Sequence, residues 1–351
     1  MDEPEIFFEQ RGKLGLVTLN RPKQLNALSY GMVKALHPQL EAWANDPSIA
    51  AVAIRGAGEK AFCAGGDIRA LYEFRGQGRV EDARTFWREE YILNRFIKRY
   101  PKPYIALIDG IVMGGGVGLA MHGSHRVAGP KFLFAMPEVG IGFFPDVGAT
   151  YLLPRLPDHA GTYLAVTGAR IGRADGLALG LATHSIASGD FTAAIDAFAD
   201  GEPVDQVLAR LAEAPGPAPI AANTRVVAET FDAASVAAIL DNLDKAASGG
   251  SEFAADTAKA MRTKSPTSMA IALEQVNRGA TLDFEDAMTL EYRIVSRIAL
   301  AHDFYEGVRA VIVDKDHKPA WQPAQIEEVK PEAIADYFAP LPDDLAFQAI
   351  G

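Results

Sequence analysis

The stretch GIVMGGGVGLAMHG, residues 110–123, decides the fold of this chain, and it follows the apolar run PYIALID. It holds six glycines in fourteen positions. Glycine costs conformational entropy and packs nothing, so this cluster indicates either a close approach to the backbone or unusual dihedral angles. A buried strand followed by glycines and a helix predicts one of three features: a phosphate close to the backbone, a tight turn of the chain, or a reacting oxygen close to the backbone.

A second unit of the same kind precedes this one. IAAVAIRG is typical of a buried strand, and AFCAGGDIRALYEF passes through another small-residue turn into a helix. Upstream, EIFFEQ and LGLVTLN predict a hairpin, and Ser29 is a suitable N-cap for the helix that follows it. Strand, turn and apolar helix recurring in this order predict an α/β fold with weak internal repetition.

The second half of the chain has a different character. Beyond about residue 186 the sequence is rich in alanine and favours helices, with breaks at 215–219 and 248–251. We therefore expect a core over residues 1–190 and a mostly helical region over 191–351 that packs on it. Gly307 is expected to stop or kink the last long helix.

The composition excludes several classes of protein. A net charge of −11 argues against a nucleic-acid partner, and no apolar run approaches the roughly twenty residues that cross a membrane. The single cysteine, Cys63, allows no intrachain disulfide. The acidic start MDEPEIFFEQRG lacks the features of a secretion signal or an organelle presequence, so a cytoplasmic protein is expected.

Familiar catalytic motifs are missing from the glycine-rich stretch. It fits neither the G-x-G-x-x-G dinucleotide fingerprint nor the P-loop, and no G-x-S-x-G nucleophile elbow occurs nearby. His122 and His125 lack a third ligand, so we expect no metal site there. Cys63 has no base beside it in sequence and is expected to be a small buried hydrophobe.

Three carboxylates are candidates for chemistry. Glu138 follows a strand and a proline, and Asp146 precedes a short apolar helix. A solvated turn residue at Glu138 and a helix N-cap at Asp146 are as good an interpretation as a catalytic role for either. Glu90 lies near the apolar stripe of the helix predicted over residues 80–100, where an acid either extends to solvent or has a function.

Four segments together resemble the crotonase, or enoyl-CoA hydratase/isomerase, superfamily. They are NRPKQLNAL, KAFCAGGDI, GIVMGGGVGLA and AMPEVGIGFFPDVG, in the order and approximate spacing of that family. REEYILN, FFPDVGATYLLPRL, SPTSMAIAL and FYEGVRAVIVDKDHKPAWQP are similar to its 3-hydroxyisobutyryl-CoA hydrolase branch. The matches span residues 6–347, and they imply a spiral of ββα repeats with a helical C-terminal region.

The resemblance also implies an acyl-CoA site in residues 1–190. The backbone N–H groups of Ala64 and Gly115 would form an oxyanion hole for the thioester carbonyl. The remaining positions along the substrate would be Gly65, Gly66, Asp67, Ile68, Arg69 and Gly114. Arg21 or Lys23 would meet a phosphate of coenzyme A.

One departure from the hydratases is informative. Enoyl-CoA hydratases use two glutamates, and at the first of these positions this chain has Gly118, while Glu138 stands at the second. A lone carboxylate suits thioester hydrolysis, with Glu138 as nucleophile or as general base. Asp146 would orient the substrate's 3-hydroxyl group or the water, and Glu90 would line the acyl pocket.

The predicted activity is hydrolysis of 3-hydroxyisobutyryl-CoA, and of 3-hydroxypropionyl-CoA, in the breakdown of valine. The alternatives are an enoyl-CoA hydratase or isomerase and a non-catalytic acyl-CoA-binding protein. Coenzyme A is part of the substrate, and no separate cofactor or metal is implied. Many relatives form trimers or hexamers, so a homo-oligomer is compatible with the resemblance.

Overall fold

The computed structural model describes residues 3–347, and the chain forms two compact units that are each discontinuous in sequence. Unit 1 comprises Met1–Asp67, Ile92–Phe134 and Ile171–Pro219. Unit 2 comprises Ile68–Tyr91, Ala135–Arg170 and Ile220–Gly351. A boundary near residue 190 does not separate these units, because the chain passes between them repeatedly before that point.

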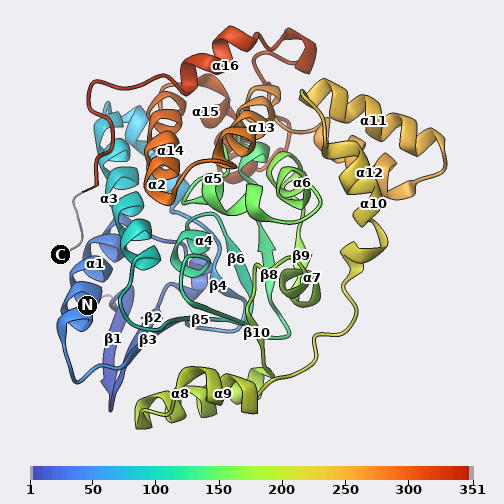
Figure 1. The fold of residues 1–351 in the computed structure, drawn as a ribbon. Coiled ribbons are helices and arrows are strands. Elements are labelled where there is room, and N and C mark those ends of the chain that lie inside the picture. The colour runs from blue at the N-terminus through green and yellow to red at the C-terminus, as the bar shows by residue number, and fades with distance from the viewer. Residues whose placement is uncertain (1–2, 348–351) are drawn as a thin grey trace. The chain divides into compact units, whose positions relative to one another are not determined.

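Unit 1 is built on two sheets whose strands pair mainly in parallel. The first sheet has the order β1 (Ile6–Arg11), β2 (Leu14–Leu19), β3 (Ala51–Gly56), β5 (Tyr104–Ile108), β7 (His125–Ala128) and β10 (His184–Ser185) (Figure 1). The second has the order β4 (Ala61–Cys63), β6 (Ile111–Met113), β8 (Leu133–Ala135) and β9 (Ile171–Gly172). The hairpin of β1 and β2 is antiparallel, as predicted.

The chain alternates between these two sheets. β3 enters the first sheet and β4 the second, and β5 and β6 repeat this order. The internal repetition predicted from the two strand-and-turn segments is therefore confirmed, and the fold is of the α/β class.

The helices of unit 1 cover its sheets. They are α1 (Tyr30–Asn45), α4 (Gly115–Ala120), α7 (Arg173–Ala178), α8 (Phe191–Asp200) and α9 (Val204–Arg210). The Ser29 hydroxyl accepts a hydrogen bond from the Met32 N–H at 3.2 Å, so the predicted N-cap of α1 is confirmed. Buried side chains at alternate positions of β2, β3 and β5 pack with those of α8 and α9; among them are Leu14, Leu16, Ile105, Leu107, Ile195 and Phe198.

Unit 2 is almost entirely helical. Its helices are α2 (Ile68–Gly76), α5 (Ala149–Leu152), α6 (Ala160–Thr167), α10 (Thr224–Phe231), α11 (Val236–Ser248), α12 (Glu252–Met261), α13 (Pro266–Gly279), α14 (Phe284–Ile298), α15 (His302–Val308) and α16 (Pro331–Tyr337). The long helix α3 (Val80–Lys98) begins in unit 2 and ends in unit 1. Within unit 2, α13 contacts α5 and α6, and α14 contacts α5. The helical second half is therefore as predicted.

Gly307 lies at the end of an α-helix, as expected, and it also allows a close backbone contact. A Cβ atom at this residue would lie 2.3 Å from the carbonyl carbon of Ile141, which belongs to the 3₁₀ turn η2 (Glu138–Ile141). The glycine therefore lets α15 approach the backbone of η2 closely, and α15 ends one residue later, at Val308.

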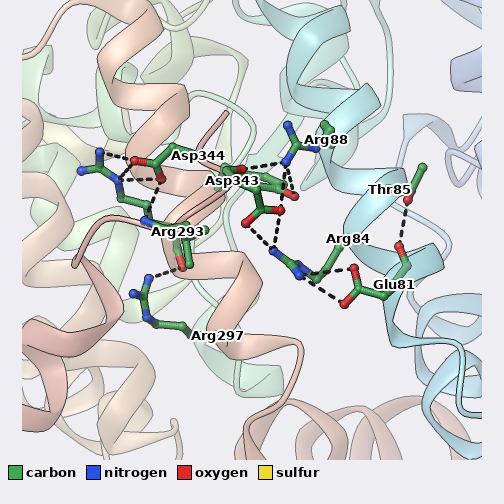
Figure 2. A network of polar contacts seen from close by, with 10 residues as sticks. Glu81, Arg84, Thr85, Arg88, Arg293, Arg297, Asp343 and Asp344 are labelled. Carbon is green, nitrogen blue, oxygen red and sulfur yellow. Dashed lines mark hydrogen bonds and ion pairs between the residues drawn. The ribbon is translucent and has the colours of Figure 1, made fainter. Parts of the chain in front are cut away.

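The segment before the C-terminus is held by arginines of two helices (Figure 2). Arg84 and Arg88 of α3 bind Asp343, at 3.2 and 3.4 Å. Arg293 of α14 binds both carboxylate oxygens of Asp344. These contacts tie residues 343–344 to both helices. Among residues 3–347, no helix is both long enough and apolar enough to cross a bilayer.

Candidate active site

The glycine-rich turn, residues 113–118, lies against the other small-residue turn within unit 1. A Cβ atom at Gly116 would lie 2.3 Å from the carbonyl oxygen of Cys63, at the end of β4. Gly114 has φ 46° and ψ −126°, a conformation that side-chain-bearing residues avoid. Bare backbone is therefore needed for the two turns to touch, in addition to any role toward a ligand.

The two turns differ in which N–H groups remain free. Gly115 is the first residue of α4, so its N–H has no partner within the helix. The N–H of Ala64 instead donates to the carbonyl oxygen of Leu25 at 3.0 Å. The expected hydrogen bond from Ala64 to a substrate oxygen therefore conflicts with this geometry. In the described part of the chain, the N–H groups of Gly65 and Gly66 have no backbone acceptor, and Gly66 is the more exposed of the two.

The other residues implied to line the substrate are partly engaged elsewhere. The Asp67 carboxylate accepts a hydrogen bond from Arg21 at 2.8 Å, and Arg21 also pairs with Glu5. Ile68 is half-buried at the start of α2, and Arg69 is exposed and paired with Glu73 at 3.3 Å. The guanidinium of Arg21 is therefore already paired with two carboxylates, and its contact with a phosphate of coenzyme A stays a prediction.

Glu138 opens the 3₁₀ turn η2 in unit 2. It is buried, and its Oε2 atom has no hydrogen-bond donor among residues 3–347. The turn is held from outside by the N–H of Ser265, which donates to the Val139 carbonyl at 3.1 Å. Burial, with a smaller contribution from the charge of Asp146, raises the pKa of Glu138 well above its usual range.

Asp146 follows η2 in the segment that leads to α5. Its Oδ2 atom accepts a hydrogen bond from the hydroxyl of Tyr91 at 2.9 Å, and both side chains are buried. Burial raises the pKa of Asp146 to about 7, although the Tyr91 hydroxyl opposes the shift. Asp146 is therefore a buried acid that titrates near neutral pH.

Glu90 on α3 is buried and does not extend to solvent. Its Oε1 atom lacks a hydrogen-bond partner in the described chain. Burial, together with the charges of Asp146 and Glu291, raises its pKa well above the usual value. Of the two interpretations left open by the sequence, extension to solvent is therefore wrong, and a function in the acyl pocket stays a prediction.

Sequence reasoning missed a fourth buried acid, Glu291 of α14. Its side chain is fully buried, and burial with the charge of Asp146 raises its pKa to about 8. The signal was present, because Glu291 lies on the same helix face as the apolar Ala287 and Ile294. Glu90 was predicted as a candidate from the same signal, an acid on an apolar helix face. Glu90, Glu138, Asp146 and Glu291 are called the acid cluster below.

The backbone beside Asp146 is strained. Val147 has φ 53°, a left-handed conformation that β-branched side chains rarely adopt and that costs on the order of 1–3 kcal/mol. Gln275 of α13 donates its Nε2 to the carbonyl oxygen of Pro145 and to the Thr150 hydroxyl. Contacts from other helices therefore hold residues 145–150 in place.

The acid cluster can bind, donate and accept protons near neutral pH. Buried carboxylates that repel one another titrate as a group. The pKa of Asp146, about 7, is lower than that of Glu291, about 8. Within residues 3–347, no set of three or more His, Cys, Asp or Glu side chains is arranged to hold a metal ion. The chemistry available from these residues is general acid, general base or nucleophilic catalysis by carboxylates.

Comparison with known proteins gives consistent results. The model of the enoyl-CoA hydratase/isomerase family matches residues 14–338. The curated protein "3-hydroxyisobutyryl-CoA hydrolase, mitochondrial" of Danio rerio is 44% identical, with 96% of this chain and 90% of that protein covered. Its namesake from Homo sapiens is 42% identical, with 98% and 91% covered.

Two solved structures share the fold. A carnitinyl-CoA dehydratase from Mycobacterium thermoresistibile has a TM-score of 0.94 at 40% identity, covering 99% of this chain and 100% of that chain. An enoyl-CoA hydratase from Rhodobacter sphaeroides 2.4.1 has a TM-score of 0.90 at 37% identity, covering 98% and 100%. The crotonase-type fold predicted from the four sequence segments is confirmed.

The prediction of a cytoplasmic location is contradicted by these comparisons. Both hydrolase relatives are named as mitochondrial proteins. The prediction rested on the acidic composition of residues 1–12. Address signals are read separately from the folded domain, so the composition of residues that enter the fold is a poor guide to the compartment.

Proposed function

Because this chain belongs to the enoyl-CoA hydratase/isomerase family, we propose that it hydrolyses 3-hydroxyisobutyryl-CoA to 3-hydroxyisobutyrate and coenzyme A. 3-Hydroxypropionyl-CoA is a second substrate, and the reaction serves valine breakdown. Identity to hydrolase relatives over nearly the whole chain supports this function. The observation in the molecule that carries it is Glu138, a buried carboxylate with a free oxygen, in a chain that has Gly118 at the other acid position of hydratases.

Glu138 acts on the thioester by one of two balanced routes. As a nucleophile, its carboxylate attacks the carbonyl carbon, the C–S bond breaks, and water then hydrolyses the resulting anhydride. As a general base, it takes a proton from the water that attacks the same carbon, and the coenzyme A thiolate leaves. Both routes consume one water and need no other reactant.

The developing negative charge falls on the thioester oxygen. In this proposal the N–H of Gly115 and the N–H of Gly66 donate to that oxygen. Gly66 replaces Ala64 because the Ala64 N–H is already bonded to Leu25. Fixed donors of this kind stabilise the transition state more than the ground state, which is the requirement for catalysis.

Asp146 and Glu90 recognise the acyl group. Asp146 accepts the hydrogen bond of the substrate's 3-hydroxyl group while Tyr91 holds its other oxygen. A buried site built for a hydroxyl rejects analogues that lack it, by ~10⁴-fold in favourable cases. Isobutyryl-CoA is therefore a poor substrate.

A second candidate activity is hydration of enoyl-CoA. The observation in its favour is that the two similar solved structures are named as a dehydratase and a hydratase. Against it stands Gly118 in α4, which offers no carboxylate to share the activation of water with Glu138.

Parallel assays of the purified protein separate the two activities. We expect rapid thiol release from 3-hydroxyisobutyryl-CoA and little loss of the enoyl absorbance of crotonyl-CoA. Rapid hydration without free thiol would mean that Asp146 or Glu90 replaces the missing acid, and the hydrolase proposal would be abandoned. Binding of both compounds without turnover of either would indicate a non-catalytic acyl-CoA-binding protein.

A further inference from the structure

Residues 145–150, which carry Asp146, are held by side chains of two helices distant in sequence. The Oε2 and Oε1 atoms of Glu291 accept hydrogen bonds from the N–H groups of Gly148 and Thr150, each at 2.8 Å. Gln275 donates to the carbonyl oxygen of Pro145 and, at 2.8 Å, to the hydroxyl of Thr150. The backbone is thus fixed on both sides of Asp146.

Asp146 depends on this backbone for its orientation. Among the side chains of residues 3–347, the hydroxyl of Tyr91 donates to its Oδ2 atom, so the position of the other oxygen depends on the backbone that carries it. The next residue, Val147, has φ 53° and would relax to a more common conformation if it were released. Such a change moves the Cα–Cβ bond of Asp146 and, with it, the carboxylate.

We propose that Glu291 and Gln275 are positioning residues that hold Asp146 in its working orientation through the backbone of residues 145–150. This inference rests on the proposed hydrolase function, in which Asp146 binds the 3-hydroxyl group. Neither residue touches the substrate in the proposal.

The segment beside Asp146 takes its side-chain acceptors from a distant helix. The N-cap of α5, Gly148, has φ 91° and offers no side-chain acceptor of its own. Instead, α14 supplies a fully buried carboxylate close enough to Asp146 for the charge of one to raise the pKa of the other. Burying a second acid there is costly, which points to a function in the site.

A double-mutant cycle tests whether Glu291 acts through Asp146. Glu291→Gln keeps the size of the side chain but loses one of the two N–H acceptors. We expect kcat for 3-hydroxyisobutyryl-CoA to fall about 10- to 100-fold, the usual cost of a misplacement near 1 Å. In the Asp146→Asn background the same change should cost about twofold or less, because the group it positions is already lost. Equal losses in the two backgrounds would overturn the proposal.

Substrate preference gives a second readout that general destabilisation would not move. The ratio of kcat/KM for 3-hydroxyisobutyryl-CoA to that for isobutyryl-CoA should fall in Glu291→Gln, as in Asp146→Asn. Ile294→Val is the matched control, because it trims a fully buried apolar side chain of the same helix, which has no polar atom to bind the backbone of residues 145–150. It should keep the wild-type ratio. An unchanged ratio in Glu291→Gln would contradict the proposal.

Gln275→Met provides the same cycle if Glu291→Gln does not fold, since it removes the donor to Pro145 and Thr150 while keeping the length of the side chain. Failure of the proposed function is recognised separately, as absence of thiol release by the wild-type protein. In that case amide hydrogen exchange still tests whether Glu291 holds the backbone of residues 145–150. Faster exchange at Gly148 and Thr150 in Glu291→Gln than in Ile294→Val supports it, and equal exchange refutes it.

Discussion

The glycine-rich turn of unit 1 and the acid cluster of unit 2 illustrate two ways in which a sequence encodes a site. The turn is continuous, and its geometry follows from bare backbone at Gly114 and Gly116. The acid cluster is assembled from α3, η2, the segment before α5, and α14, which span residues 90–291. A local motif is therefore visible in the sequence, whereas a cluster made by tertiary packing is visible only in part.

The two regions also differ in their effect on the stability of the fold. In the turn, glycines relieve contacts that any side chain would make. In the acid cluster, burial raises the pKa values of all four carboxyl groups, so ionising them costs more free energy than it would in water. Acid and base groups with such pKa values are typical of catalytic sites, and the stability they cost is typical as well.

The largest effect is expected at the acid with a free oxygen. Glu138→Gln should lower kcat by about 10²- to 10⁴-fold, because an amide can neither attack the thioester nor take a proton from water. Binding of the acyl-CoA should persist, since the shape of the side chain is kept. Steady-state thiol release and calorimetric binding measure the two quantities. Glu274→Gln, at a partly exposed glutamate paired with Arg278, is the control and should retain wild-type kcat. Full activity in Glu138→Gln would refute the assigned mechanism.

A slightly smaller effect is expected in the turn. Gly116→Ala places a Cβ atom 2.3 Å from the Cys63 carbonyl oxygen, so the two turns must separate. Because this moves the N–H of Gly115, we expect a loss of about 10²- to 10³-fold in kcat, the cost of one oxyanion donor, together with a lower Tm. Gly189→Ala, at an exposed glycine of unit 1 with no atom within 4 Å of the added Cβ, should change neither. A lower Tm with unchanged kcat would separate the packing role of the turn from catalysis.

The sequence predicted the fold well because the fold depends on periodic features. The buried strands, the Ser29 cap and the repeated strand-and-turn units each follow from a few neighbouring residues, whereas the division of the strands into two sheets was not predicted. The free N–H groups of the first turn were harder to assign, since the bond from Ala64 to Leu25 joins segments that only the tertiary structure brings together. Glu291 lies on an apolar helix face, so its burial was predictable, but its bonds to Gly148 and Thr150 were not.

The smallest effect concerns the pH dependence of folding, and it tests whether the acid cluster lowers stability. Asp146 has a pKa of about 7 when folded and an ordinary value of 3.8 when unfolded. Between these values the folded state keeps a proton that the unfolded state has lost, so the free energy of unfolding must fall as pH rises. At up to 1.36 kcal/mol per pH unit, the wild type should lose on the order of 1.5 kcal/mol from Asp146 between about pH 5.5 and pH 7. Asp146→Asn removes this contribution, and urea unfolding at several pH values should show a flatter profile. Asp256→Asn, at an exposed acid of α12, should retain the wild-type profile, because that carboxyl is in water in both states. Parallel profiles for wild type and Asp146→Asn would mean that Asp146 is ionised in the folded protein throughout this range. The stability cost of the acid cluster would then come from Glu90, Glu138 and Glu291 and from the strained backbone at Val147.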